Sequence, residues 1–148
     1  MIKNDLTWYR ENNFPKEVVN WAEELASHIE QYYRLSFDGL FISNKKNEEQ
    51  EDYPSLWLYN NDYVVESKDF LSQKQLDIDL ARYHGNVKYF NIIADNFTSL
   101  NNPTDESKII LQVSLGNNIR CDISAVGVNC SNLNKLAQKF IEEHIENL

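Results

Sequence analysis

Apolar side chains recur at the spacing of an amphipathic α-helix in two segments, one near each end of the chain. The first helix is predicted from about residue 15 to residue 34, because Pro15 suits the first helical position, where its missing N–H loses no hydrogen bond. The apolar positions of this helix follow at spacings of four, three, four and three residues: Val18, Ala22, Leu25, Ile29 and Tyr32. That face is expected to pack against a core.

The second helix is predicted from about residue 131 to residue 147. The side-chain oxygen of Ser131 is expected to cap its first turn by accepting a backbone N–H. The positions that form its stripe are Leu133, Leu136, Ala137, Phe140, Ile141, His144, Ile145 and Leu148. This stripe is the longest helical pattern in the chain and predicts a helix that covers a sheet.

Short apolar runs separated by turn residues predict strands between the two helices. Leu56–Tyr59 and residues 63–65 flank residues 60–62, which predict a hairpin because Asn and Asp tolerate the backbone conformations of tight turns. A short buried strand is expected at residues 40–42. The highly charged residues 45–52 are expected to form a solvated loop.

Further strands are predicted in the second half of the chain, at residues 87–97, 108–115 and 119–126. Residues 68–84 fit either a strand or a helix, and the alternation of Leu76, Ile78 and Leu80 with polar residues favours a strand. In the last two strands, the residues expected to point inward are Ile109, Leu111, Val113, Leu115, Ile119, Cys121, Ile123 and Ala125.

These elements predict the α+β class, since strands joined by tight hairpins lie antiparallel to each other. The whole chain, residues 1–148, is expected to be one domain. It consists of a meandering, mostly antiparallel sheet of about six or seven strands. An N-terminal helix (about 15–34) and a C-terminal helix (about 131–147) pack against that sheet.

The charge balance narrows the classes of function. The 148 residues contain 14 Lys and Arg against 23 Asp and Glu, a net charge of −9. This balance argues against nucleic-acid binding, which needs a basic surface, and favours a basic protein partner. No apolar run approaches the ~20 residues of a membrane-spanning helix, so a cytoplasmic location is expected. Two cysteines are too few for a disulfide framework, and four scattered glycines form no nucleotide-binding loop, so no cofactor is implied.

The preferred hypothesis is a small, acidic, non-enzymatic protein-binding domain. One concrete form is an immunity or inhibitor protein that neutralises a basic toxin or nuclease. The expected contact surface combines the acidic loop with the tip of the first hairpin, because carboxylates steer a basic partner and tyrosines anchor it. The candidate partner-binding residues are Glu48, Glu49, Glu51, Asp52, Tyr59, Asp62 and Tyr63. Ordinary packing of the tyrosines in the sheet is the alternative.

A second hypothesis follows from residues 54–68, in which an apolar run after a proline ends in Glu66 and Lys68. This string resembles the second and third strands of the PD-(D/E)xK nuclease superfamily. The resemblance implies a metal-dependent nuclease, or an inactive relative, centred on Glu66 and Lys68. Its carboxylates would hold Mg²⁺ and its lysine would stabilise charge. The chain departs from the motif at Ser55, which stands where the family has a metal-binding Asp.

Other candidate groups are weaker. Asp77 and Asp79 share one face of a predicted strand, where they suit a cation or a solvated surface. His84 lies in a predicted turn and is a possible surface ligand. Cys121 and Cys130 are expected to be structural: Cys121 belongs to a buried alternation, and no partner base is evident for Cys130 beside its helix.

Overall fold

The computed structural model describes residues 2–44, 54–72, 75–97, 99, 102–116 and 119–148. Its elements, in chain order, are α1 (Ile2–Glu11), α2 (Lys16–Tyr33), β1 (Gly39–Ile42), β2 (Leu56–Tyr59), β3 (Tyr63–Lys68), β4 (Asp77–Arg82), β5 (Tyr89–Asp95), β6 (Lys108–Ser114), β7 (Arg120–Val126), a 3-10 turn η1 (Gly127–Asn129) and α3 (Cys130–Glu146). The predicted α+β class and the antiparallel pairing of the strands are confirmed.

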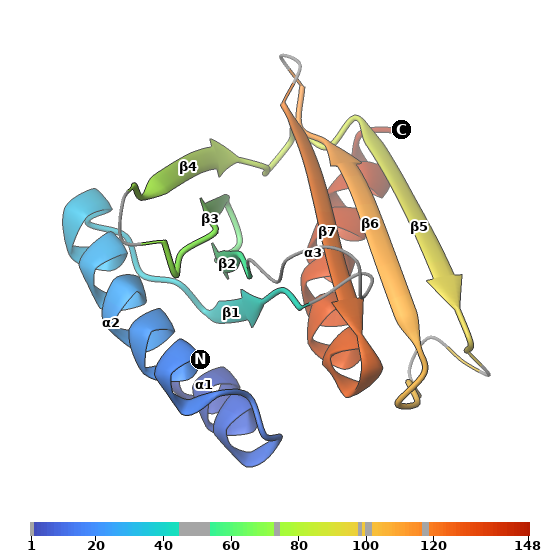
Figure 1. Ribbon diagram of the computed structural model, residues 1–148. Coiled ribbons are helices and arrows are strands. Elements are labelled where there is room, and N and C mark those ends of the chain that lie inside the picture. The colour runs from blue at the N-terminus through green and yellow to red at the C-terminus, as the bar shows by residue number, and fades with distance from the viewer. Residues whose placement is uncertain (1, 45–53, 73–74, 98, 100–101, 117–118) are drawn as a thin grey trace.

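The strands divide between two sheets rather than forming one meander. One sheet has the order β1-β2-β3-β4 and the other has the order β5-β6-β7, with every pair antiparallel (Figure 1). The break falls between β4 and β5, where Tyr83 and Val87 are both buried and Gly85 has a φ of +75°. Because Tyr83 and Val87 are buried on either side of the turn at Gly85, the chain leaves the edge of β4 here and β5 joins the second sheet. Alternation alone cannot reveal this break, because it does not specify which strand edges pair.

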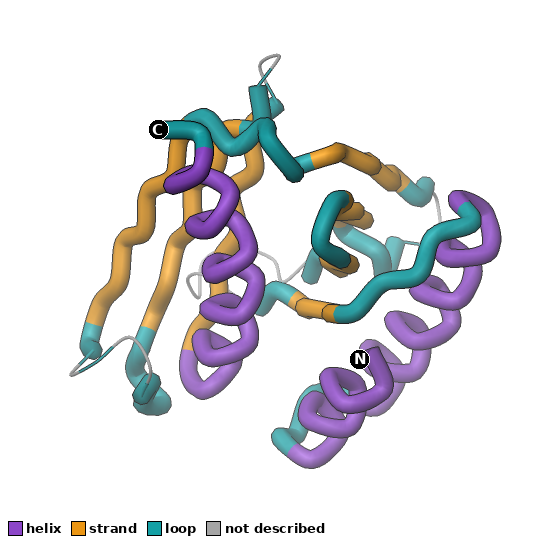
Figure 2. The backbone as a smooth tube through the Cα atoms, turned by 180° about the vertical axis from the view of Figure 1, so that it is seen from behind, coloured by secondary structure: helices purple, strands orange, loops and turns teal. Residues whose placement is uncertain are grey.

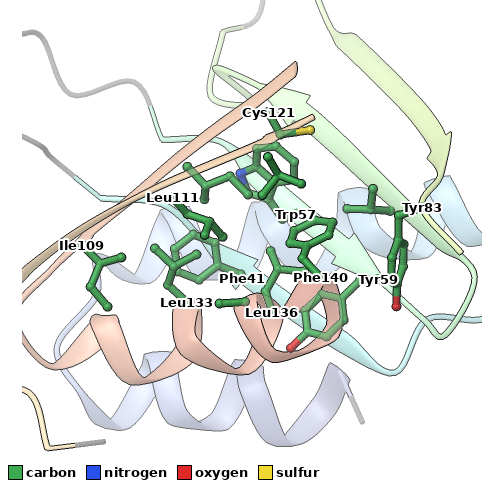
Figure 3. Packing of buried hydrophobic residues seen from close by; sticks show 14 of the residues in the cluster. Phe41, Trp57, Tyr59, Tyr83, Ile109, Leu111, Cys121, Leu133, Leu136 and Phe140 are labelled. Carbon is green, nitrogen blue, oxygen red and sulfur yellow. The ribbon is translucent and has the colours of Figure 1, made fainter. Parts of the chain in front are cut away.

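Strands β1 and β2 of the four-stranded sheet are buried on both faces. Leu40, Leu58 and Val65 face α1 and α2 on one side. Phe41 and Trp57 face α3 and the second sheet on the other side (Figure 3). Figure 2 shows α3 lying along the three-stranded sheet. This burial on both faces explains why β1 and β2 are continuous apolar runs instead of alternating ones.

Helix α1 closes the free edge of β1 with its side chains. The backbone N–H of Leu40 donates to Oδ2 of Asp5 at 2.9 Å, and the N–H of Ile42 donates to the hydroxyl of Tyr9 at 2.9 Å. The spacings match, because four residues of helix rise ~6 Å and two residues of strand span ~6.6 Å. A helix laid along the strand therefore supplies a hydrogen-bond partner to each of these two edge N–H groups.

A buried polar network joins this edge to the C-terminal part of the chain. The Tyr9 hydroxyl donates to Oδ1 of Asn129 at 2.9 Å, and Nδ2 of Asn129 donates to the Ile42 carbonyl at 2.8 Å. Asn44 pairs with the backbone of Val126 through both ends of its amide, as a neighbouring strand would. Nδ2 of Asn132 also donates to Asn129. We call these residues, Tyr9, Asn44, Asn129 and Asn132, the buried network.

Several predicted boundaries hold, and others change. Both long helices and the first hairpin lie where predicted, and residues 77–82 form a strand, not a helix. Ile119 is 43% exposed and precedes β7, so the prediction that it points inward is wrong. Ser131 does not cap α3, since its hydroxyl donates to the Val128 carbonyl after a 3-10 turn has already started the helix.

The predicted loop at residues 45–52 and the turn at residues 117–118 lie outside the described residues. Within the described part of the chain, no helix combines the length and the apolar character that a membrane-spanning segment needs.

Asn129→Ala is expected to lower the free energy of unfolding by about 2–4 kcal/mol, because it leaves the Ile42 carbonyl and the Tyr9 hydroxyl buried with fewer partners. Urea denaturation measures the change. Asn20→Ala on the exposed side of α2 is the matched control and should change stability by less than about 0.5 kcal/mol. Equal effects of the two substitutions would contradict a structural role for the network.

Candidate functional site

The tip of the β2–β3 hairpin is held rigidly by its own side chains. The backbone N–H groups of Asp62 and Tyr63 donate to Oδ1 of Asn60 at 2.9 and 2.8 Å. Nδ2 of Asn60 in turn donates to the Ser36 carbonyl at 2.9 Å. Because Asn60 bonds both to the turn and to the segment before β1, the backbone that carries Asp62 is held in place.

The fold brings the C-terminal half of α3 and the β4–β5 turn against this tip. The N–H groups of Tyr83 and His84 donate to the Asp62 carbonyl, and Nζ of Lys139 donates to Oδ1 of Asn61 at 2.8 Å. Together these segments surround a hollow of about 310 Å³, which we call the acidic pocket. Its lining residues are Asn61, Asp62, Tyr83, His84, Lys139, Glu142 and Glu143.

Glu143 organises the floor of the acidic pocket. One of its carboxylate oxygens lies 2.9 Å from Nδ1 of His84, and the other accepts the Gly85 N–H at 2.8 Å. Burial opposes the ionisation of Glu143, but the hydrogen bonds from Gly85 and His84 outweigh it and hold its pKa below the usual value. The pocket therefore keeps this negative charge over a wide pH range.

The predicted partner-binding residues separate into three groups. Asp62 is exposed and Tyr63 is half-buried, so both offer surface at the hairpin tip. Tyr59 is only 5% exposed and lies in the core (Figure 3). Its ring covers Gly39 so closely that a side chain at position 39 would overlap it. Tyr59 therefore offers almost no surface to a partner. Glu48, Glu49, Glu51 and Asp52 lie outside the described residues.

Sequence reasoning missed most of the acidic pocket. His84 and Glu143 are 59 positions apart, and no local pattern connects them. The only signal was the placement of His84 in a turn. Glu142 and Glu143 were part of the polar side of a predicted helix, and nothing in the pattern indicates that this side meets the hairpin.

Glu66 and Lys68 lie on the sheet face that looks toward β7. Glu66 stands opposite Asp79 in the strand register, and Nζ of Lys68 lies 3.8 Å from Oδ2 of Asp79. Burial, together with Asp79, Asp77 and Asp122, raises the pKa of Glu66 to about 7, although Lys68 opposes the shift. Among the described residues, no three His, Cys, Asp or Glu side chains are placed to hold a metal ion. The metal-dependent alternative gains no support from this face.

Both cysteines are buried, which confirms the predicted burial of Cys121. Burial raises the pKa of Cys121 to about 12 and the pKa of Cys130 to about 11, and the negative charge of Glu66 adds to the shift at Cys121. The thiols therefore stay protonated at neutral pH. This protonation suits packing and does not suit nucleophilic chemistry.

Comparison with protein-family models, with curated proteins and with solved structures found no match to this chain.

Glu66→Gln is expected to stabilise the protein at alkaline pH and to change little in acid. Since the folded pKa lies above the usual 4.5, folding favours protonated Glu66, and that stability is lost as the pH rises through about 7. The gain at about pH 8 should be about 1–2 kcal/mol, because partial solvent contact reduces the full effect of the shift.

Urea denaturation of both proteins at about pH 5 and about pH 8 measures this difference. Glu24→Gln on the exposed surface of α2 removes the same charge and serves as the control. The raised pKa of Glu66 would be contradicted if the difference in unfolding free energy between Glu66→Gln and the native protein were the same at both pH values.

Proposed function

We propose that the protein is an acidic protein-binding domain that recognises a basic protein partner, and that it acts as an immunity-type inhibitor of a basic toxin or nuclease. The observation that carries this proposal is the acidic pocket, in which Asp62, Glu142 and Glu143 converge from a hairpin tip and a helix. Lys139 and His84, the two basic residues of the lining, are already bonded to Asn61 and Glu143.

The size and polarity of the acidic pocket favour a charged group over an apolar ligand. Its volume of about 310 Å³ is at the lower end of the ~300–1,000 Å³ of small-molecule pockets, and most small-molecule pockets have apolar linings. A Lys or Arg side chain of a partner suits it better. Because the hairpin tip is rigid before binding, little ordering entropy is lost when the partner docks.

Inhibition follows from the nature of a basic target. An enzyme that acts on nucleic acid needs a positively charged cleft to bind phosphates. A domain with a net charge of −9 is attracted to such a cleft, and its carboxylates occupy the positions that phosphates would take. Binding of the domain to this cleft then also inhibits the target.

The test begins with capture of partners from the lysate of the source organism at low and high salt, followed by their identification. The variant Asp62→Lys/Glu142→Lys reverses two charges of the acidic pocket. It is expected to lower the association rate with the captured protein at least about tenfold at low salt, since charge reversal removes electrostatic steering. Stopped-flow binding measures that rate, and an assay of the partner's own activity measures inhibition.

The matched control is Glu23→Lys/Glu24→Lys, which makes the same charge change on exposed residues of α2. It should retain most of the rate. Equal losses in both variants would show only a general effect of net charge and would overturn the pocket as the binding site. Thermal unfolding of each variant confirms that the fold is intact.

A further inference from the structure

The two edge strands of the four-stranded sheet are treated differently by the rest of the chain. At β1, side chains from α1 and the η1 turn bond to the outward N–H groups of Leu40 and Ile42 and to the Ile42 carbonyl. At β4, on the opposite edge, the described residues provide no such cover. An open edge presents a row of unpaired backbone groups and is a template for another strand.

The strand register identifies which groups of β4 point outward. The Tyr83 N–H donates to the Asp62 carbonyl, so Tyr83 and every second residue before it bond toward β3. The backbone groups of Ile78, Leu80 and Arg82 therefore point away from the sheet. The Arg82 carbonyl is bonded by Nδ2 of Asn86. Within the described part of the chain, nothing bonds to the outward groups of Ile78 and Leu80.

The side chains along β4 alternate in chemistry. Asp77 and Asp79 are exposed on the face that also carries Glu66. Leu80 is 38% exposed on the other face, next to half-buried Ile78, and Leu76 just before the strand is 45% exposed. The strand contains neither Lys nor Pro, the residues that commonly block a free edge.

The acidic residues also select the occupant. Antiparallel pairing of β4 with a second copy of itself would bring four aspartates onto one face, and in the registers centred on Ile78 or Asp79 aspartates lie directly opposite each other, which destabilises a sheet. A basic segment meets the opposite situation, because Lys or Arg across from Asp77 and Asp79 form favourable cross-strand pairs. The open edge of β4 therefore favours a basic strand over a second copy of β4.

We propose that β4 binds an extended segment of the basic partner as an added antiparallel strand. Basic residues of that segment lie opposite Asp77 and Asp79, and apolar residues lie opposite Ile78 and Leu80. The choice of a basic occupant rests on the proposed function. The surface is continuous with the acidic pocket, since β4 leads into Tyr83 and His84, which are bonded to Asp62. The pocket and the edge then form one binding surface.

Two synthetic peptides test this inference without the natural partner. Both are seven residues of alternating Lys and Val, and they differ only in the positions that carry N-methyl groups. In antiparallel addition, the valines lie opposite Ile78 and Leu80 and direct their N–H groups toward β4, whereas the lysines direct theirs away. The peptide methylated at valine is expected to bind at least about tenfold more weakly than the peptide methylated at lysine, because it loses the edge hydrogen bonds.

Two further readouts locate the site. Binding of the lysine-methylated peptide should slow amide hydrogen exchange at Ile78 and Leu80. Leu80→Pro removes an outward N–H without removing a bond to β3, so it should weaken binding while Leu80→Ala retains it. If Leu80→Pro fails to fold, the comparison of the two peptides still decides the question.

Equal affinity of the two peptides, or exchange protection at β5 in place of β4, would overturn strand addition. That result is distinct from failure of the proposed function, which depends on the captured partner and the charge-reversal variant of the acidic pocket. A partner that binds through the pocket while both peptides bind equally would leave the proposed function standing without the strand.

Discussion

The buried network of Tyr9, Asn44, Asn129 and Asn132 is the interaction on which the rest of the structure depends. It joins α1, the end of β1, the end of β7 and the start of α3 at one point. Each member satisfies a backbone or side-chain group that would otherwise be buried without a partner. Apolar packing between the two cores is compatible with many arrangements, whereas these directional hydrogen bonds are all satisfied in only one arrangement.

This constraint reaches the candidate site through α3. The network fixes the first turn of the helix, and about three turns later Glu142 and Glu143 face the hairpin tip. The hairpin is in turn held by Asn60, and the Lys139 bond to Asn61 joins the two. The acidic pocket is therefore a product of tertiary structure, and its parts come from both halves of the chain.

The sequence pattern predicted the elements well and their assembly poorly. The 3.6-residue period located both long helices and the two-residue period located strands such as β6 and β7, because burial on one side leaves a periodic trace, whereas β1 and β2 were located by short continuous apolar runs. The division into two sheets was not predicted, since Tyr83 and Val87 show no sign of anchoring a crossing connection. The candidate site was predicted only in part: among the described residues, Asp62 is the predicted partner-binding residue that lines the acidic pocket, and it follows from a local turn signal. The pairing of His84 with Glu143 depends on two distant segments meeting, and Tyr59 was misplaced because a buried and an exposed tyrosine look alike in sequence.

The position of Asn129 in the chain also has a consequence for biosynthesis. The bond that Tyr9 donates to Asn129 spans 120 residues, and the bond that Asn129 donates to the Ile42 carbonyl spans 87. When the first four strands leave the ribosome, the residue that completes the β1 edge has not yet been made. The hydrogen bonding of the β1 edge in the nascent sheet therefore stays incomplete until α3 emerges. Such long-range contacts slow folding and expose intermediates to aggregation.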